Sequence, residues 1–175
     1  MRRLMLLRHA KTERAGPGER DRDRKLMKRG RSDASTIGAY MAHHGLVPDL
    51  ALVSPATRAQ ETWLLAAAAF APAPPMLTND RIYNADTERL LGVIGDAHKK
   101  VHTLIVVGHN PGLHDLALVL IASGEAKARE RITEKMPTSG LVVIDLPLDD
   151  WSLIQAQPGR LERFVSPSLI GQAPD

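Results

Sequence analysis

The sequence contains no cysteine and very few aromatic residues, with two each of Trp, Tyr and Phe among 175 residues. Without cysteine, the chain has no disulfide framework, no thiolate zinc site and no cysteine nucleophile. The shortage of aromatic side chains leaves little surface on which nucleic-acid bases could stack. The core is therefore expected to consist mainly of aliphatic side chains, and any catalysis must use groups other than thiols.

Long hydrophobic runs are also lacking. The N-terminal "MRRLMLLRHA" begins with basic residues, but Arg8 interrupts its apolar run too early for a signal peptide. The alanine-rich "WLLAAAAFA" is far shorter than the roughly 20 apolar residues that cross a bilayer. We therefore expect a cytoplasmic protein that does not contact a membrane.

The overall composition, 43% hydrophobic and 25% charged, is typical of one globular domain. No internal repeat or long linker divides the chain. We predict a single domain over residues 1–165, followed by a loosely ordered C-terminal tail over residues 166–175.

The formal net charge of +3 favours anionic ligands without specifying one. Much of the excess lies in residues 20–31, where basic and acidic residues alternate. Alternating signs are typical of a solvated loop or a substrate rim, whereas a nucleic-acid patch has a block of one sign. We therefore expect no nucleic-acid partner, and the role of this basic loop stays open.

Apolar runs alternate with amphipathic stretches, a pattern typical of repeated strand–helix–strand units. Helix 54–70 should have Ser54 as N-cap and Pro55 in its first turn. Near the C-terminus, "GLVVIDLP" and "WSLIQAQ", separated by "LDD", predict an antiparallel hairpin over residues 140–157. We predict a three-layer α/β/α sandwich with a mostly parallel sheet and an antiparallel strand. The other predicted elements are strands at 3–7, 50–54, 75–79 and 102–108, and helices at 31–45, 86–97 and 109–122.

Charged and polar residues follow three of the predicted parallel strands. Arg8 and His9 come directly after the first strand, and His109 and Asn110 come directly after "LIVVG". Arg58 lies in the first turn of the helix that follows "LALVS". Ligands bind at the carboxyl ends of parallel strands in open α/β sheets, so these residues should share one rim.

These residue types suit a phosphoryl group. Arginine presents a planar fork of donors that matches phosphate oxygens, and a neutral histidine ring can attack phosphorus. Taken singly, each residue also has a plainer explanation. The pair Arg8 and His9 could lie on the surface, Arg58 could pair with Glu61 one helical turn away, and His109 could bond a backbone group.

The segments "LLRHAKT", "SPATRAQET" and "VVGHNPG" resemble the three signatures of the histidine phosphatase superfamily, the phosphoglycerate-mutase-like proteins named for an Arg-His-Gly motif. "DRDRKLMKRGRSDA" is similar to the family's linker after the first strand, and "MPTSGLVVIDLP" to its antiparallel strand. Ala10 and the short chain resemble the bacterial phosphohistidine phosphatase branch, often called SixA.

The resemblance implies a role for each matching residue. His9 would be the nucleophile and would form a transient phosphohistidine. Arg8, Arg58 and His109 would bind the phosphoryl oxygens, and His109 would also stabilise the transition state. Asn110 would contribute its backbone N–H at the helix start.

One departure from the family pattern concerns the general acid. Members that act on alkyl phosphates usually carry an acidic residue after the third strand. Asp80, Asp86 and Glu88 occur there, but none stands in the familiar motif, and Asp86 could simply cap a helix. An alkoxide leaving group needs a proton, a contribution of roughly 10²–10⁴ in rate. A phosphorylated imidazole whose distal nitrogen carries a proton can leave as a neutral ring and needs less help than an alkoxide. The missing acid therefore favours phosphohistidine as the substrate.

These observations predict a metal-independent phosphatase with a histidine nucleophile, acting on phosphohistidine in proteins. Fixed arginine donors can stabilise the transferring group, so we expect neither a metal nor another cofactor. One alternative is a small-molecule phosphomonoesterase of the same superfamily, acting on a phosphorylated metabolite. Another is a non-catalytic module that binds phosphate or a phosphoprotein.

Overall fold

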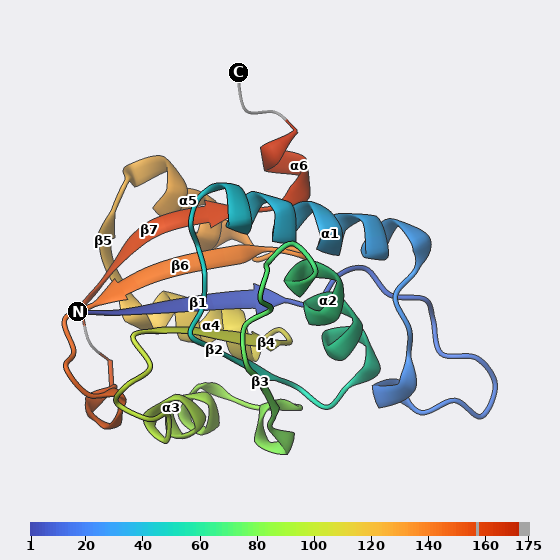
Figure 1. Cartoon of the computed structure of the whole chain (residues 1–175), viewed down its shortest axis with the longest axis horizontal. Coiled ribbons are helices and arrows are strands. Elements are labelled where there is room, and N and C mark those ends of the chain that lie inside the picture. Colours follow the sequence, from blue (N-terminus) through green and yellow to red (C-terminus); the bar gives the residue numbers. More distant parts are fainter. Residues whose placement is uncertain (157, 172–175) are drawn as a thin grey trace.

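The computed structural model describes residues 1–156 and 158–171. One sheet forms its centre (Figure 1), made of the strands β1 (Arg2–Arg8), β2 (Leu50–Val53), β3 (Met76–Thr78), β4 (Thr103–Gly108), β5 (Ile121–Gly124), β6 (Leu141–Leu146) and β7 (Gly159–Val165). The seven strands lie in the order β3-β2-β4-β1-β6-β7-β5. The first strand in sequence therefore lies in the middle of the sheet.

Most strands of the sheet run in one direction. β1 is parallel to β4, β4 is parallel to β2, and β2 is parallel to β3. β6 is antiparallel to both of its neighbours, β1 and β7, while β5 is parallel to β7. The predicted mostly parallel sheet with an antiparallel strand is confirmed.

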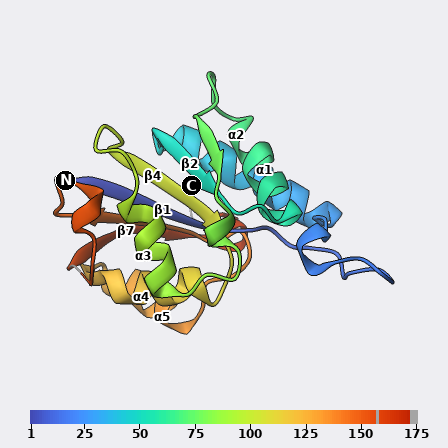
Figure 2. The same ribbon diagram turned by 90° about the horizontal axis from the view of Figure 1, so that it is seen from below.

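Helices cover both faces of the sheet (Figure 2), which completes the predicted α/β/α sandwich. One face carries α1 (Lys28–His43), α2 (Thr57–Ala67) and the short α6 (Pro167–Ile170). The other face carries α3 (Thr87–Gly95), α4 (Gly112–Leu120) and α5 (Ala126–Glu134). Short 3-10 turns are η1 (Asp21–Asp23), η2 (Asp80–Ile82) and η3 (Trp151–Leu153). Among the described residues, no helix is both long and apolar enough to span a membrane.

β1 shows why its run of apolar residues forms a central strand. Successive side chains of a strand point to opposite faces. Leu4 and Leu6 pack into the core under α3 and α4, whereas Met5 and Leu7 pack into the core under α1 and α2. All four side chains are fully buried. The end of β1, which carries Arg8, is thus held between two packed layers.

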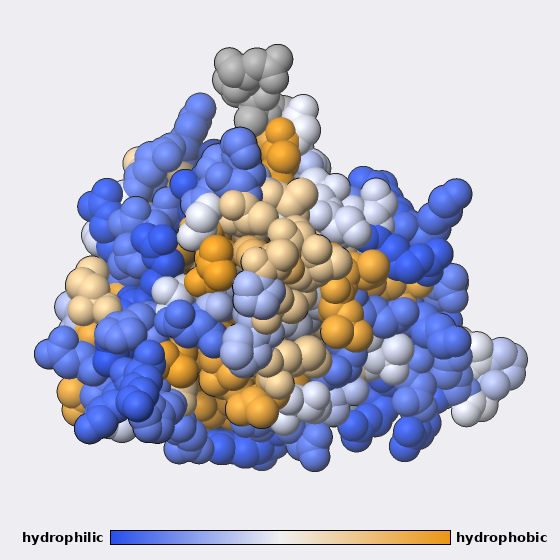
Figure 3. Space-filling model, viewed as in Figure 1, coloured by the Kyte–Doolittle hydropathy of each residue, from blue (hydrophilic) through white to orange (hydrophobic). Residues whose placement is uncertain are grey.

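The outer surface is mostly polar, with an apolar area near the middle of the face that carries α2 and β3 (Figure 3). Leu64 of α2 and Leu77 of β3 are both exposed. β3 lies at one edge of the sheet, so Leu77 has a strand neighbour on one side only.

The prediction that Ser54 caps α2 is wrong. Ala56 occupies the N-cap position and the helix begins at Thr57. Ser54 is fully buried, and its Oγ lies 2.7 Å from Nε2 of His109. A contact with a distant segment has therefore taken the hydroxyl that helix capping would have used.

The predicted C-terminal hairpin is only half right. Residues 141–146 form β6, but Trp151–Leu153 form η3, and Gln157 lies outside the described residues. The Trp151 ring is fully buried, and its Nε1–H donates to the carbonyl of Val101 at 2.6 Å. The antiparallel partner of β6 is β7, further along the chain.

The other predicted strands and helices are present, with boundaries shifted by a few residues. β5, α5, β7 and α6 were not predicted; α5 reads "AKARERITE" and buries only Ala128 and Ile132, so its apolar pattern is weak. The predicted C-terminal tail contains α6, and residues 172–175 lie outside the described part of the chain. The domain boundary at residue 165 stays a prediction.

Candidate active site

The sheet topology brings three strand ends together. β2, β4 and β1 are adjacent and parallel, so their carboxyl ends lie at one rim of the sheet. Arg8 ends β1, His109 follows β4, and Arg58 lies in the first turn of α2, which follows β2. The ring centroids of His9 and His109 are 5.3 Å apart. Residues that are far apart in sequence thus meet at the predicted rim.

The His9 ring is oriented by the backbone. Its Nδ1 lies 2.8 Å from the carbonyl oxygen of Ala10. A carbonyl oxygen only accepts, so Nδ1 carries the proton and Nε2 keeps a free lone pair. The main chain of His9 is held as well, because its N–H donates to Gly108 and its carbonyl accepts from Ser139. The lone pair of the ring therefore lies on Nε2.

Both histidine rings are neutral at pH 7. Burial lowers the pKa of His9 to about 4, and the nearby positive charges of Arg58 and Arg8 act in the same direction. The hydrogen bond to Ala10 opposes this shift without cancelling it. Burial likewise lowers the pKa of His109 to about 3, assisted by His9 and Arg58.

Arg8 and Asn110 share one acceptor. Nη1 of Arg8 donates to the carbonyl oxygen of Met136 at 3.1 Å, and Nδ2 of Asn110 donates to the same oxygen at 2.8 Å. Nε of Arg8 and Oδ1 of Asn110 are buried and have no hydrogen-bond partner within the described chain. The Met136 carbonyl thus positions both side chains while leaving polar atoms of each available.

Arg58 is buried and is held by the basic loop. Its Nη1 donates to the backbone oxygen of Asp21 at 2.8 Å, and its Nη2 donates to Oδ2 of Asp21 at 3.1 Å. Glu61, the partner considered from sequence, instead accepts from the N–H of Leu26. Arg58 is therefore fixed by a distant segment and not by its own helix.

Asp21 collects three donors from different parts of the chain. Besides Arg58, the hydroxyl of Tyr83 donates to its Oδ2 at 2.6 Å, and Nη1 of Arg24 donates to its Oδ1 at 3.1 Å. The Tyr83 hydrogen bond, with those of Arg24 and Arg58, holds the pKa of Asp21 well below its usual range. Asp21 therefore remains a carboxylate and ties η1 to α2 and to the segment after η2.

Sequence reasoning missed Asp21, Tyr83 and Ser54. The Tyr83 ring stands edge-on to His109, with centroids 5.5 Å apart and an interplanar angle of 85°. The Oγ of Ser54 contacts the same ring at its Nε2. Asp21 was one acid among several in an alternating run, and no periodicity or motif distinguished Tyr83, so neither carried a signal.

The three acidic candidates differ in position. Asp86 caps α3, since its Oδ1 accepts from the N–H of Arg89 at 2.9 Å. It also lines a hollow of about 230 Å³ together with His109 and Asn110. Asp80 and Glu88 are exposed and do not line this hollow. Of the three, Asp86 is the carboxylate that shares a cavity with the candidate site.

Two guanidinium groups and two neutral imidazoles at one sheet edge can bind an anion and offer it a nitrogen nucleophile. Arginine forks suit the oxygens of a phosphoryl group. In the part of the chain that the structure describes, no group of three or more His, Asp or Glu residues could hold a metal ion.

Comparison with known proteins agrees with this geometry. The model of the histidine phosphatase superfamily (branch 1) matches residues 4–93, which include Arg8, His9 and Arg58. An uncharacterised protein of Mycobacterium tuberculosis is 39% identical over 141 residues, covering 79% of this chain and 85% of that protein.

Solved structures share the whole fold. A candidate phosphohistidine phosphatase, SixA, from Agrobacterium tumefaciens has a TM-score of 0.80 and 34% identity, covering 94% of this chain and 97% of that one. The protein histidine phosphatase SixA complexed with tungstate has a TM-score of 0.75 at 17% identity, covering 96% and 99%, which compares the fold alone. The fold of the present chain and its sequence matches together support a phosphatase function. The chain belongs to the histidine phosphatase superfamily, and its structure is SixA-like.

Proposed function

We propose that this protein hydrolyses phosphohistidine in proteins, with His9 as the nucleophile. The observation that carries the proposal is the hydrogen bond between His9 Nδ1 and the Ala10 carbonyl, which leaves Nε2 unprotonated. The low pKa of His9 keeps that lone pair available at neutral pH. Arg8, Arg58 and His109 lie at the same rim of the sheet as His9.

In the first step, Nε2 of His9 forms a bond to phosphorus while the bond from phosphorus to the substrate imidazole breaks. The leaving ring takes the electron pair and departs as neutral imidazole when its distal nitrogen carries a proton. Arg8 and Arg58 donate to the equatorial oxygens, where charge is spread in the transition state. Positive charge held in place by hydrogen bonds to Met136 and Asp21 needs little rearrangement.

In the second step, water attacks the phosphorus of the phosphorylated His9. A P–O bond forms, the bond from phosphorus to Nε2 breaks, and the ring recovers its lone pair. The water keeps one proton on the new P–O–H group and passes the other to a phosphoryl oxygen, so inorganic phosphate is released as dihydrogen phosphate. The Ala10 carbonyl favours the Nδ1-protonated ring before and after the cycle.

The choice of phosphohistidine rests on two supports. Asp80 and Glu88 are exposed and do not line the hollow beside His109, so neither is placed there to protonate an alkoxide. A phosphorylated imidazole needs less help in leaving. The second support is the 34% identity to a SixA protein described as a candidate phosphohistidine phosphatase.

The first experiment measures phosphate release from three substrates, a phosphohistidine peptide, a phosphoserine peptide and a small sugar phosphate. We expect the intact protein to release phosphate fastest from phosphohistidine, and His9→Ala to be inactive because it lacks the attacking nitrogen. Rapid-quench trapping should also find acid-labile phosphate on His9 of the intact protein. A His9→Ala variant with full activity would overturn the assignment, and binding without turnover would indicate a non-catalytic phosphoprotein-binding module.

The second candidate function is that of a small-molecule phosphomonoesterase, and the position of Asp86 favours it. This carboxylate lines the same hollow as His109 and Asn110. Asp86→Asn keeps a good helix cap but cannot supply a proton. If Asp86 were the acid, this variant would lose roughly 10²–10⁴ in rate on the sugar phosphate. Under our proposal, the phosphohistidine rate changes little, and Glu88→Gln serves as the matched control.

A further inference from the structure

A second, positively charged groove lies beside the candidate active site. It has a volume of about 240 Å³, and Lys11, Arg29 and Lys135 line it together with one acid, Asp33. Hydroxyl groups, including that of Thr138, complete its polar lining. No part of the phosphoryl-transfer chemistry described above uses these three cations.

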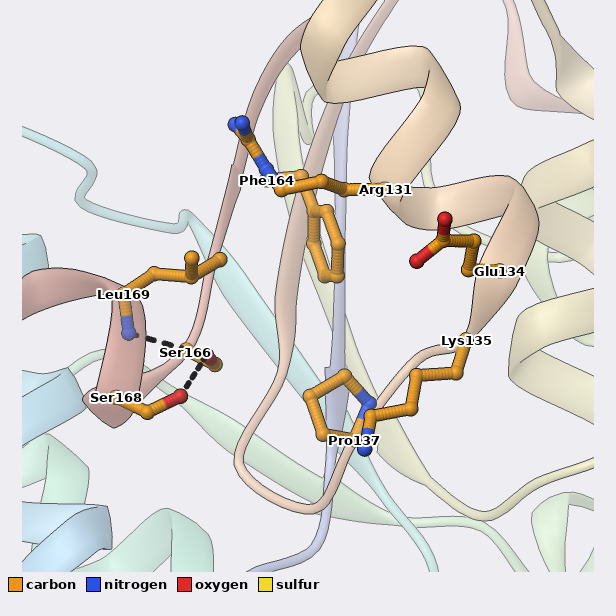
Figure 4. Close-up of a pocket in the computed structure, with 8 residues that line it drawn as sticks. All are labelled: Arg131, Glu134, Lys135, Pro137, Phe164, Ser166, Ser168 and Leu169. Carbon is orange, nitrogen blue, oxygen red and sulfur yellow. Dashed lines mark hydrogen bonds between the residues drawn. The ribbon is translucent and has the colours of Figure 1, made fainter.

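The groove continues into a neighbouring hollow of about 210 Å³, shown in Figure 4. Lys135, Pro137, Ser166 and Ser168 line both, so the two hollows adjoin each other on the surface. α5 adds Arg131 and Glu134 to the second hollow, and Figure 4 shows the Arg131 side chain extending away from Glu134. The lining of the two hollows together contains four cationic and two acidic side chains.

One acid, Asp33, lines the groove beside these cations but forms no direct ion pair with any of them in the described part of the chain. Lys11, Arg29 and Lys135 are exposed, and none forms an ion pair within residues 1–156 and 158–171. Among residues 20–31, which include Arg29, Arg20 pairs with Asp23 and Arg24 pairs with Asp21. The three cations of the groove are therefore open to pair with acidic groups of a ligand.

Both walls of the groove are attached to the backbone that positions the phosphoryl site. Lys11 follows His9 by two residues, and its carbonyl accepts from the N–H of Met27. A Cβ added to Gly30 would lie 2.1 Å from that same carbonyl, so the first turn of α1 rests directly on Lys11. On the other wall, Lys135 precedes Met136, whose carbonyl binds Arg8 and Asn110.

Resting on the function proposed above, we propose that this groove binds an acidic segment of the phosphorylated protein substrate. Aspartate or glutamate side chains of that segment would lie against Lys11, Arg29 and Lys135 while the phosphohistidine reaches His9. A sugar phosphate is too small to occupy the site and these hollows together. The arrangement would thus select a protein by the charge of the chain around its phosphohistidine.

Equilibrium binding tests the groove without relying on turnover. The probes are two fluorescent peptides with a central histidine, one flanked by glutamates and the other by glutamines. Fluorescence anisotropy at low ionic strength should show tighter binding of the glutamate peptide to the intact protein. Arg29→Gln/Lys135→Gln should weaken that binding about five-fold, the size expected for two exposed charge pairs.

The matched control is Lys99→Gln/Lys100→Gln, which removes the same charge from exposed residues that precede β4, at the opposite edge of the sheet. This variant should bind the glutamate peptide as tightly as the intact protein does. Equal binding of the two peptides, or an equal loss in both variants, would overturn the proposal, because the effect would then be one of net charge alone.

A turnover experiment separates this inference from the proposed function. With both peptides phosphorylated on histidine, the ratio of their kcat/KM values should favour the glutamate peptide in the intact protein. The ratio should approach one in Arg29→Gln/Lys135→Gln. Equal hydrolysis of both peptides by the intact protein would contradict the groove alone. Hydrolysis of neither would contradict the proposed function, and the anisotropy result would still decide the groove.

Discussion

His9 and His109 are neutral because they are partly withdrawn from water beside two arginines. A histidine in an unfolded chain has a pKa near 6.5, whereas burial lowers the pKa of His9 to about 4 and that of His109 to about 3. Below pH 6.5, protons therefore bind the unfolded chain more readily than the folded one. The stabilisation from both rings is complete above pH 6.5 and is lost as the pH falls toward 4 and then 3.

This difference predicts that the free energy of unfolding decreases as the pH is lowered from 7 to 4. His9→Asn removes one of the two rings but keeps an N–H donor for the Ala10 carbonyl. Since one pKa unit corresponds to about 1.4 kcal/mol, the decrease should be smaller in His9→Asn by about 3 kcal/mol. Urea unfolding of both proteins at pH 7, 5.5 and 4 measures it. An identical pH dependence in the two would show that His9 titrates as it does in the unfolded chain.

At the scale of elements, η1 is held in place mainly by one carboxylate. Asp21 accepts from Arg24 within its own loop, from Arg58 of α2 and from Tyr83 after η2. Asp23, two residues further, pairs with the exposed Arg20. Exposed pairs contribute little to stability, whereas removing a partner of a buried arginine costs more. The two acids of η1 should therefore differ in their effect on the loop.

Asp21→Asn should loosen the segment between the end of β1 and the start of α1. Asparagine keeps one acceptor oxygen but loses the other and the negative charge that strengthens the hydrogen bonds from Arg58 and Arg24. A loss of about 1 kcal/mol corresponds to roughly five-fold faster trypsin cleavage after Arg20, Arg22 or Arg24. Mass spectrometry of timed digests gives the rates, and Asp23→Asn is the control that should be cut as slowly as the intact protein. Equal rates in both variants would mean that Asp21 does not anchor the loop.

At the scale of the whole molecule, one sheet is shared by two cores. Trp63 lies in the core under α1 and α2, and Trp151 lies in the core under α3, α4 and α5. The strands between them contribute side chains to both, as β1 does with Leu4 and Met5. Neither core can lose its packing without exposing strands of the other, so both should unfold together.

Two single-tryptophan variants test this cooperativity and the prediction of a single domain. Trp63→Phe leaves Trp151 to report on one core, and Trp151→Phe leaves Trp63 to report on the other. Within each variant, the urea midpoint from fluorescence should equal the midpoint from far-UV circular dichroism. A fluorescence midpoint that differs from the circular dichroism midpoint in either variant would show that the two faces of the sheet unfold separately.

Part of the candidate site could be read from the sequence because it depends on local signals. Apolar runs marked β1, β2 and β4, and polar residues at their ends marked Arg8, His9, Arg58 and His109. Parallel strands align their carboxyl ends, so the run of strands and helices was enough to place these residues on one rim. The superfamily signatures lie on the same segments, which is why fold class and family were both confirmed.

The remaining features were decided by contacts between segments that are distant in sequence. Ser54 contacts His109 instead of capping α2, and Trp151 is buried in a 3-10 turn where a strand was expected at "WSLIQAQ". Asp21 accepts hydrogen bonds from both Tyr83 and Arg58. The sequence by itself determined which residues end the parallel strands, since a strand is an apolar run of the local chain. Only the tertiary structure decided which of several similar acids or hydroxyls bonds to them, because a single hydrogen bond between distant residues leaves no periodicity in the sequence.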